Sequence, residues 1–136
     1  MAAFSDYAEN KLLDHVCDVV QWDTSLLVLY ATLFIADNGL EAGTITGEVA
    51  NLYAYARQAV TFGTAASGGA ISNTVAVTFP AALGGNWGTI THCALLDSVT
   101  YGAGNVVVHG ALSASRVIND TNQFSFAIGD LTLTLA

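Results

Sequence analysis

The residues of this chain that could support chemistry are few and scattered. A nucleophile needs an adjacent general base and a group that orients that base. The serines lie in turns rich in glycine and alanine without a G-x-S-x-G motif, and Cys93 has only His92 beside it. Neighbouring residues of a strand point to opposite faces, so that pair cannot act together. The sequence therefore predicts no nucleophilic catalysis and no enzymatic activity.

The three histidines are the next candidates. His92 and His109 lie in predicted strands that could be neighbours, and with Cys93 or Asp97 they could form a metal site of mixed ligands. The more ordinary interpretation is that they make hydrogen bonds or interface contacts, and His15 is interpreted in the same way. The calcium pattern D-x-D-x-D-G is absent. We therefore expect neither a metal nor another cofactor.

Arginine and tryptophan side chains offer contacts rather than reactions. Arg57 and Arg116 stand in a chain with a surplus of carboxylates, and each should pair with a carboxylate inside the domain or across a subunit boundary. Trp22 and Trp87 could stack on sugar rings, but packing in the core or at an interface is their more ordinary role.

The composition is acidic and unusually apolar. Eleven acids stand against three Lys or Arg, giving a formal net charge of −8, so no basic patch could neutralise a nucleic-acid backbone. Of the 136 residues, 53% are hydrophobic, which is more than one domain of this length can bury. We expect a single domain over residues 1–136, no nucleic-acid partner, and exposed apolar surface that serves an oligomer or covers another protein.

Neither a secretory signal nor a membrane span is expected. Asp6 and Glu9 stand where a signal peptide is positively charged. The longest apolar run, from Leu26 to Ala36, is shorter than the roughly 20 residues that cross a bilayer. Cys17 and Cys93 fit neither a disulfide framework nor a paired redox motif, so free buried thiols are expected, with a single disulfide as the alternative.

The elements that would position these residues begin with one helix. Ser5 can cap a helix that starts at Asp6 and extends to about residue 20. Apolar residues recur along it at spacings of three and four, namely Ala8, Leu12, Leu13, Val16, Val19 and Val20. This stripe should dock either on the chain's own sheet or on a neighbouring subunit.

Short alternating runs after the helix predict strands. They cover about residues 26–36, 55–63, 70–79, 89–97, 104–112 and 122–135, and an interruption of the last is considered near Gly129 and Asp130. Residues 40–52 are predicted to form a long loop with at most one strand, and they are the first candidate for contact with a partner. The pattern is typical of a mainly β protein, an antiparallel β-sandwich or open barrel with one N-terminal α-helix.

Four segments in co-linear order resemble small structural proteins of tailed bacteriophages. They are residues 4–15 (FSDYAENKLLDH), 55–63 (YARQAVTFG), 87–92 (WGTITH) and 126–131 (FAIGDL). Such proteins are usually labelled tail fibre or minor structural proteins, and some similar proteins decorate capsids. The chain departs from the family pattern at residues 17–22, where a stretch containing proline and threonine is common.

The resemblance implies a non-enzymatic component of the virion, assembled in the host bacterial cytoplasm. The first interpretation is a capsid decoration (cement) protein, most often a homotrimer, that binds the outer surface of the major capsid protein shell and stabilises it. The alternative is a tail fibre or baseplate component that binds tail proteins and takes part in host attachment. A carbohydrate-binding module is a third interpretation.

The candidates for partner or oligomer contacts come from the helical stripe, the acidic long loop, the aromatic residues and the two arginines. They are Leu12, Leu13, Val16, Trp22, Glu41, Glu48, Tyr53, Tyr55, Arg57, Trp87 and Arg116.

Overall fold

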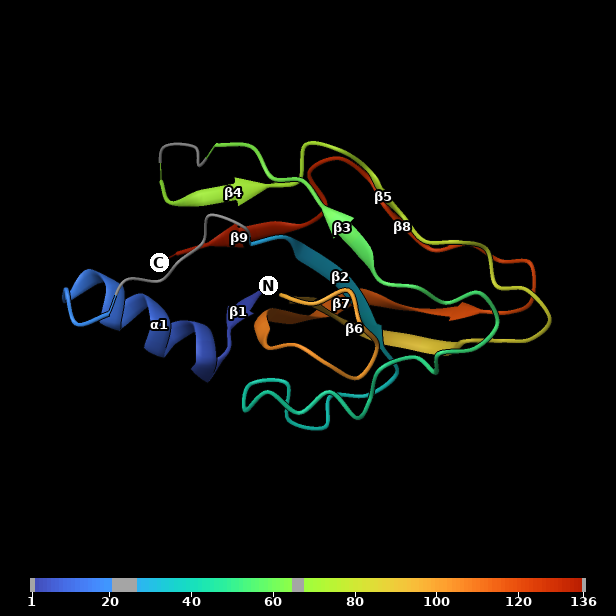
Figure 1. The fold of residues 1–136 in the computed structure, drawn as a ribbon. Helices are drawn as coiled ribbons and strands as arrows, with labels where there is room; N and C mark the ends of the chain where they lie inside the picture. Colours follow the sequence, from blue (N-terminus) through green and yellow to red (C-terminus); the bar gives the residue numbers. More distant parts are fainter. Residues whose placement is uncertain (1, 21–26, 65–67, 136) are drawn as a thin grey trace.

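The computed structural model describes residues 2–20, 27–64 and 68–135, which form the predicted mainly β, antiparallel fold with one N-terminal helix (Figure 1). The largest sheet has the order β1-β7-β6-β2-β3. Its strands are β1 (Ala3–Phe4), β2 (Leu29–Phe34), β3 (Gln58–Val60), β6 (Gly88–Leu96) and β7 (Val106–Ile118). Two small sheets pair β4 (Ala70–Ser72) with β9 (Thr132–Thr134) and β5 (Val77–Thr78) with β8 (Ser125–Phe126).

Helix α1 (Asp6–Val16) extends from one end of the main sheet (Figure 1). Ser5 is its N-cap: the hydroxyl accepts a hydrogen bond from the Ala8 N–H and donates one to the Val106 carbonyl. The helix has 11 residues, so the predicted extension to residue 20 is wrong. Asp18 adopts a φ of 58°, a left-handed conformation that an Asp can adopt but that ends a right-handed helix.

Both faces of the main sheet are covered. Successive residues of the central strand β6 point to opposite faces. Leu95 therefore joins a large core that includes the aromatic residues of the small sheets, while Leu96 packs on the other face with Phe34 and Leu40. The loop after β2 supplies Leu40 to this second cluster and passes along one edge of the molecule in Figure 1. No helix in the described part of the chain is long and apolar enough to cross a membrane.

Asn73 explains why two predicted strands are each divided. Its buried amide nitrogen donates to the carbonyls of Val75 and Ala127, at 2.8 and 3.0 Å. Its amide oxygen accepts from the N–H groups of Gly129 and Leu131, at 3.1 and 3.0 Å. These four bonds take the place of ladder pairing, so residues 70–79 form β4 and β5, and residues 122–135 form β8 and β9.

A large β-bulge extends β7 beyond its predicted end. Ile90 pairs with Arg116 and His92 with Ala111, so Thr91 alone faces residues 112–115. The predicted strand 104–112 ended where the bulge begins, since the small residues there break the alternation that indicates a strand. The predicted strand 89–97 corresponds to β6 (Gly88–Leu96). Two other predicted strands are shorter in the structure: 55–63 contributes only β3, and the described part of 26–36 contributes β2.

Candidate functional site

A buried ion pair joins the long loop to the turn between β6 and β7. The guanidinium of Arg57 donates to both carboxylate oxygens of Glu48, from Nε at 2.8 Å and from Nη2 at 2.7 Å. Its Nη1 donates to the carbonyls of Ser98 and Ala103, at 2.7 and 2.8 Å. The planar fork of arginine suits this arrangement. Both side chains are 2% exposed or less, so neither can contact a partner.

Tyr55 completes this buried network. Its hydroxyl donates to Glu48 Oε1 at 3.2 Å and accepts from the Leu33 N–H at 3.0 Å. Burial, together with the charge of Glu48, raises the pKa of Tyr55 far above its usual value, so the phenol stays protonated and acts as a donor. The network links residues that lie far apart in the sequence. It contains no reactive nucleophile, and it leaves no ligand position free for a metal ion. Its role is structural.

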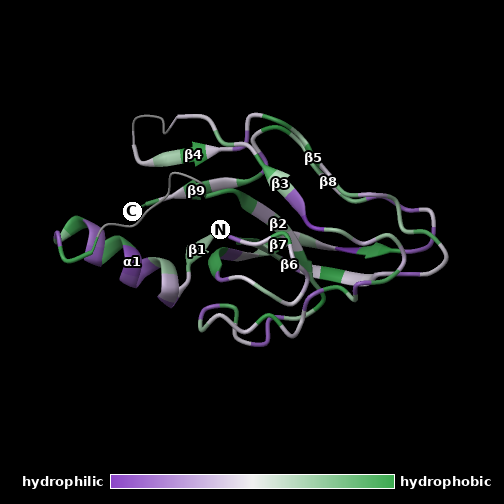
Figure 2. Cartoon of the chain, viewed as in Figure 1, coloured by the Kyte–Doolittle hydropathy of each residue, from purple (hydrophilic) through white to green (hydrophobic). Residues whose placement is uncertain are grey.

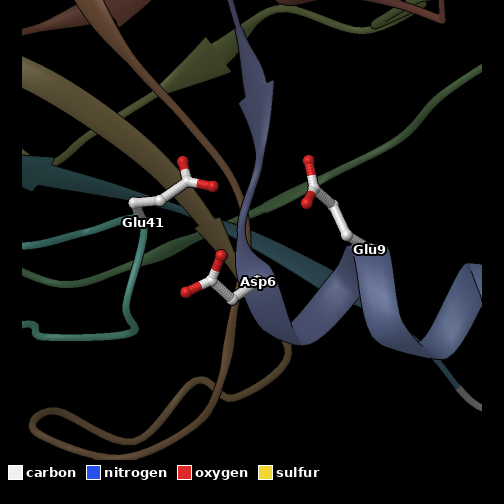
Figure 3. A group of neighbouring side chains, drawn as sticks. All are labelled: Asp6, Glu9 and Glu41. Carbon is white, nitrogen blue, oxygen red and sulfur yellow. The ribbon is translucent and has the colours of Figure 1, made fainter.

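Three exposed carboxylates gather at the start of α1. Asp6 and Glu9 project from the first helical turn and Glu41 from the adjacent loop, with ligand oxygens within 4.8 Å of one another (Figure 3). Acidic residues are favourable in this position because the N-terminus of a helix carries partial positive charge. Glu41 also pairs with His109, at 2.7 Å between Oε2 and Nε2. These local interactions account for the cluster, and we assign no cation to it.

The candidates for a histidine and cysteine metal site do not converge. His109 pairs with Glu41, whereas the Nδ1 of His92 lies 2.9 Å from the hydroxyl of Thr91. Cys93 is buried, and burial raises the pKa of its thiol to about 12. Cys17 is also a free thiol but is exposed, so the expectation that both thiols are buried is wrong for Cys17. Its position just past the helix end removes it from the core.

The aromatic candidates divide between core and surface. Trp87 is buried in edge contact with Tyr55, with ring centroids 5.4 Å apart, and its Nε1 donates to the Tyr53 carbonyl at 2.9 Å. This packing leaves the Trp87 ring unable to stack on a sugar. The Tyr53 side chain is 43% exposed and lies so close to Gly85 that a Cβ there would clash with its ring. Trp22 lies outside the described residues.

The described residues cover helix α1 on one side only. Ala8 is fully buried and Leu12 is partly buried, but Leu13 and Val16 are 61% and 72% exposed. Val19 and Val20, in the turn that follows, are exposed as well, and Figure 2 shows hydrophobic residues at this far end of the helix. We call Leu13, Val16, Val19 and Val20 the outer helical face.

The β-bulge forms one wall of a groove of about 480 Å³. The segment around β9 also lines it, as do Phe124 and Phe126. We call this the bulge groove; its lining includes Leu112, Ala114, Arg116, Phe124, Leu131 and Leu133. The Arg116 guanidinium lies over the Phe124 ring, 5.5 Å from its centroid, and the ion pairs found among the described residues do not include Arg116.

The sequence did not predict a groove. Of the residues that line it, Arg116 alone was among the predicted contact residues. Leu112 marked the end of a predicted strand, and Ala114 lay in a segment assigned to no element. The only available signal was the group of small residues on either side of Leu112, Gly110–Ala111 and Ser113–Ser115, which weakens strand pairing and is compatible with a bulge.

The comparison with protein families decides what kind of protein carries these features. The model of the family described as Podophage GP4 fiber I protein gp80 matches residues 3–134. The chain belongs to this gp80 fibre family. The match spans nearly the whole chain, including the helix, both core clusters and the bulge groove. No curated protein matches the sequence.

Membership of the gp80 fibre family identifies the chain as a structural protein of a tailed-phage virion, and the family description is that of a fibre. This agrees with the tailed-phage resemblance carried by the four sequence segments. Between the two placements considered from the sequence, the match favours the tail fibre over capsid decoration.

Proposed function

We propose that this chain is a non-enzymatic tail-fibre component that takes part in attachment of the virion to its host. The observation that carries the proposal is the match of the fibre family to residues 3–134. The protein would be assembled with other tail proteins in the host cytoplasm. Capsid decoration, placed first from the sequence, gains no support of its own from the fold or the family.

The geometry is compatible with a structural role. The titratable groups with the most buried positions, Glu48, Arg57 and Tyr55, bond to one another and to backbone atoms. Exposed apolar side chains lie on the helix and the turn after it, and apolar residues line much of the groove beside the bulge. Surfaces of this kind suit contact with protein.

Quantitative mass spectrometry of purified virions tests the location of the chain. A tail fibre follows the low rotational symmetry of the tail, so we expect from a few to tens of copies per particle, whereas a shell protein follows the copy number of the major capsid protein. A ratio to the major capsid protein near one to one, or a simple fraction of it, would overturn the proposal. Absence from the virion would overturn it as well.

An adsorption assay tests the attachment role. Virions treated with monovalent antibody fragments against this chain should adsorb to host cells more slowly, while fragments against the major capsid protein serve as the matched control. If saturating fragments against the chain leave adsorption unchanged and labelled virions show them bound at the tail, the chain is a tail component without a role in attachment.

A further inference from the structure

We propose that copies of this chain associate head to tail, with the outer helical face of one copy seated in the bulge groove of the next. The helical face is apolar and the groove is lined mainly by apolar residues; the described residues leave both open, and the two surfaces lie on different elements. The inference concerns self-association of the chain, and it can fail without affecting the proposed location in the tail.

The helix cannot cover its own groove. Its first turn is fixed to the body of the protein by Ser5, whose N–H donates to the Val107 carbonyl at 3.1 Å and whose hydroxyl bonds to Val106. The Asp6 N–H donates to the Glu41 carbonyl at 3.1 Å, and Ala8 is fully buried. These contacts set the direction of the helix and leave Val16 exposed, so the described residues supply no cover for the outer helical face.

The extent of the surface agrees with a missing interface. The chain has an accessible surface of 7385 Å² for a mass of 14.1 kDa. A compact monomer of this mass has about 6,700 Å², so the chain exposes about 700 Å² more than expected. Each partner in a protein interface of standard size contributes about 800 Å². The excess surface is therefore of the size that one such contact buries.

The helix and the groove carry one complementary pair of charges, Glu9 and Arg116, while Asp130, which also lines the groove, accepts a hydrogen bond from the Ala127 N–H at 2.8 Å. Glu9 lies one helical turn before Leu13, on the same side of the helix, and belongs to the acidic cluster with Asp6 and Glu41. Arg116 lies in the groove and is held over Phe124. Two chains with a net charge of −8 repel each other, so a carboxylate facing a guanidinium at the contact would favour this docking over others.

A contact between two different surfaces is heterologous, and such contacts close into a ring or extend into an open chain. A second copy is the partner that the structure favours, because one chain carries both complementary surfaces. The trimer expected from the sequence would be the smallest ring beyond a dimer.

Sedimentation velocity of the purified chain from about 1 to 100 µM tests the contact, since interfaces of this size bind in the micromolar range or tighter. We expect concentration-dependent oligomers for the natural sequence. Val16→Asp and Ala114→Asp each place a charge in the apolar contact and should weaken association at least tenfold. Leu83→Asp is the matched control: Leu83 and Val16 are both 72% exposed, and the three variants have the same net charge. A natural chain that stays monomeric throughout, or variants that all associate alike, would overturn the proposal.

Mixing the two defective variants tests the head-to-tail geometry. Val16→Asp retains an intact groove and Ala114→Asp an intact helix, so together they should form a complex that neither forms alone. Association of Ala114→Asp at the natural strength would indicate a symmetric helix-to-helix contact and overturn the assignment of the groove. Circular dichroism shows whether each variant is folded, and both substitutions are at exposed positions.

A charge exchange tests the proposed ion pair. Glu9→Arg and Arg116→Glu should each weaken association by placing like charges together, and the double variant should recover most of the natural affinity. If the double variant loses as much affinity as each single variant, the two residues do not face each other, and the proposed docking is wrong.

Discussion

Two regions of the molecule, the ion-pair side and the open side, place their polar and apolar residues in opposite environments. On the ion-pair side, formed by residues 35–57 and the turn at residues 97–105, Arg57 is buried and makes four hydrogen bonds. On the open side, formed by the outer helical face and the bulge groove, Arg116 is exposed, and the other described residues leave the apolar side chains of the helical face exposed. The same residue type therefore stabilises the fold at one position and is available for contact at the other.

Burial separates residues that could form an interface from residues that belong to the fold. Glu48, Tyr55, Arg57 and Trp87 were proposed as contact residues because of their types, but all four are buried. Leu13, Val16 and Arg116 are exposed, at surfaces that the described part of the chain leaves open. Buried polar residues that hydrogen-bond to one another indicate internal structure, whereas exposed apolar residues indicate where a partner can bind.

The largest effect is expected from a break in the network of the ion-pair side. Glu48→Gln leaves the buried Arg57 guanidinium without a counter-charge and should lower the free energy of unfolding by about 3–5 kcal/mol. In a domain of this size that corresponds to a fall in Tm of roughly 10–20 °C. Urea denaturation followed by tryptophan fluorescence measures the change.

Glu41→Gln is the matched control on the surface. Glu41 also forms an ion pair, with His109, but its side chain is 51% exposed, and exposed pairs contribute about 0–1 kcal/mol. If both variants lose equal stability, burial does not make the Glu48 pair more important to the fold than the exposed Glu41 pair.

Asn73→Ala tests how much the hydrogen bonds beside the groove contribute to stability, compared with those of the ion-pair side. The substitution removes the four hydrogen bonds that connect Asn73 to residues 75 and 127–131 and should cost about 2–3 kcal/mol, because backbone groups lose their partners. The same variant should associate less well, since Leu131 lines the groove. Asn51→Ala, at an exposed position, is the control and should change neither quantity.

The sequence predicted the features that depend on local chemistry. The cap at Ser5 and the helix start at Asp6 are confirmed, because capping and the first-turn acids act within a few residues. The antiparallel, mainly β fold with one N-terminal helix is also confirmed. It follows from the spacing of alternating apolar residues, which a single sequence displays directly.

The features that the sequence missed depend on contacts between distant residues. Glu48 lies in a segment that resembles a surface loop, and it is buried only because Arg57 and the turn at residues 97–105 come together around it. Asn73 divides two strands through bonds to residues 54 to 58 positions away. The bulge depends on the register between β6 and β7, which the pattern of one strand does not determine.

Ser5→Ala tests the attachment of the helix, on which the exposure of the open side depends. Loss of the hydroxyl removes the cap of α1 and leaves the buried Val106 carbonyl without that donor, so unfolding should become easier by about 1–2 kcal/mol. Hydrogen exchange of the first helical amides should increase more than that of β6. If the amides of α1 and β6 in the variant are equally protected from hydrogen exchange, Ser5 does not set the direction of the helix. Ser113→Ala, exposed in the bulge, is the control.

The smallest effect is expected from Asp37, an exposed residue of the ion-pair side. Its Oδ1 accepts from the N–H groups of Leu40 and Gly39, both at 2.9 Å, and these bonds hold the pKa of Asp37 below its usual value. A carboxyl whose pKa is lower in the folded state stabilises the fold above its unfolded pKa, and this stabilisation is lost as the pH falls through the folded value. Asp37→Asn should therefore cost roughly 0.5 kcal/mol near neutral pH, since solvent screens an exposed group, and the difference from the natural chain should shrink below about pH 4. Urea melts of both chains between pH 3 and 7 measure that difference, and a gap that widens toward low pH would show that the carboxylate does not stabilise this turn.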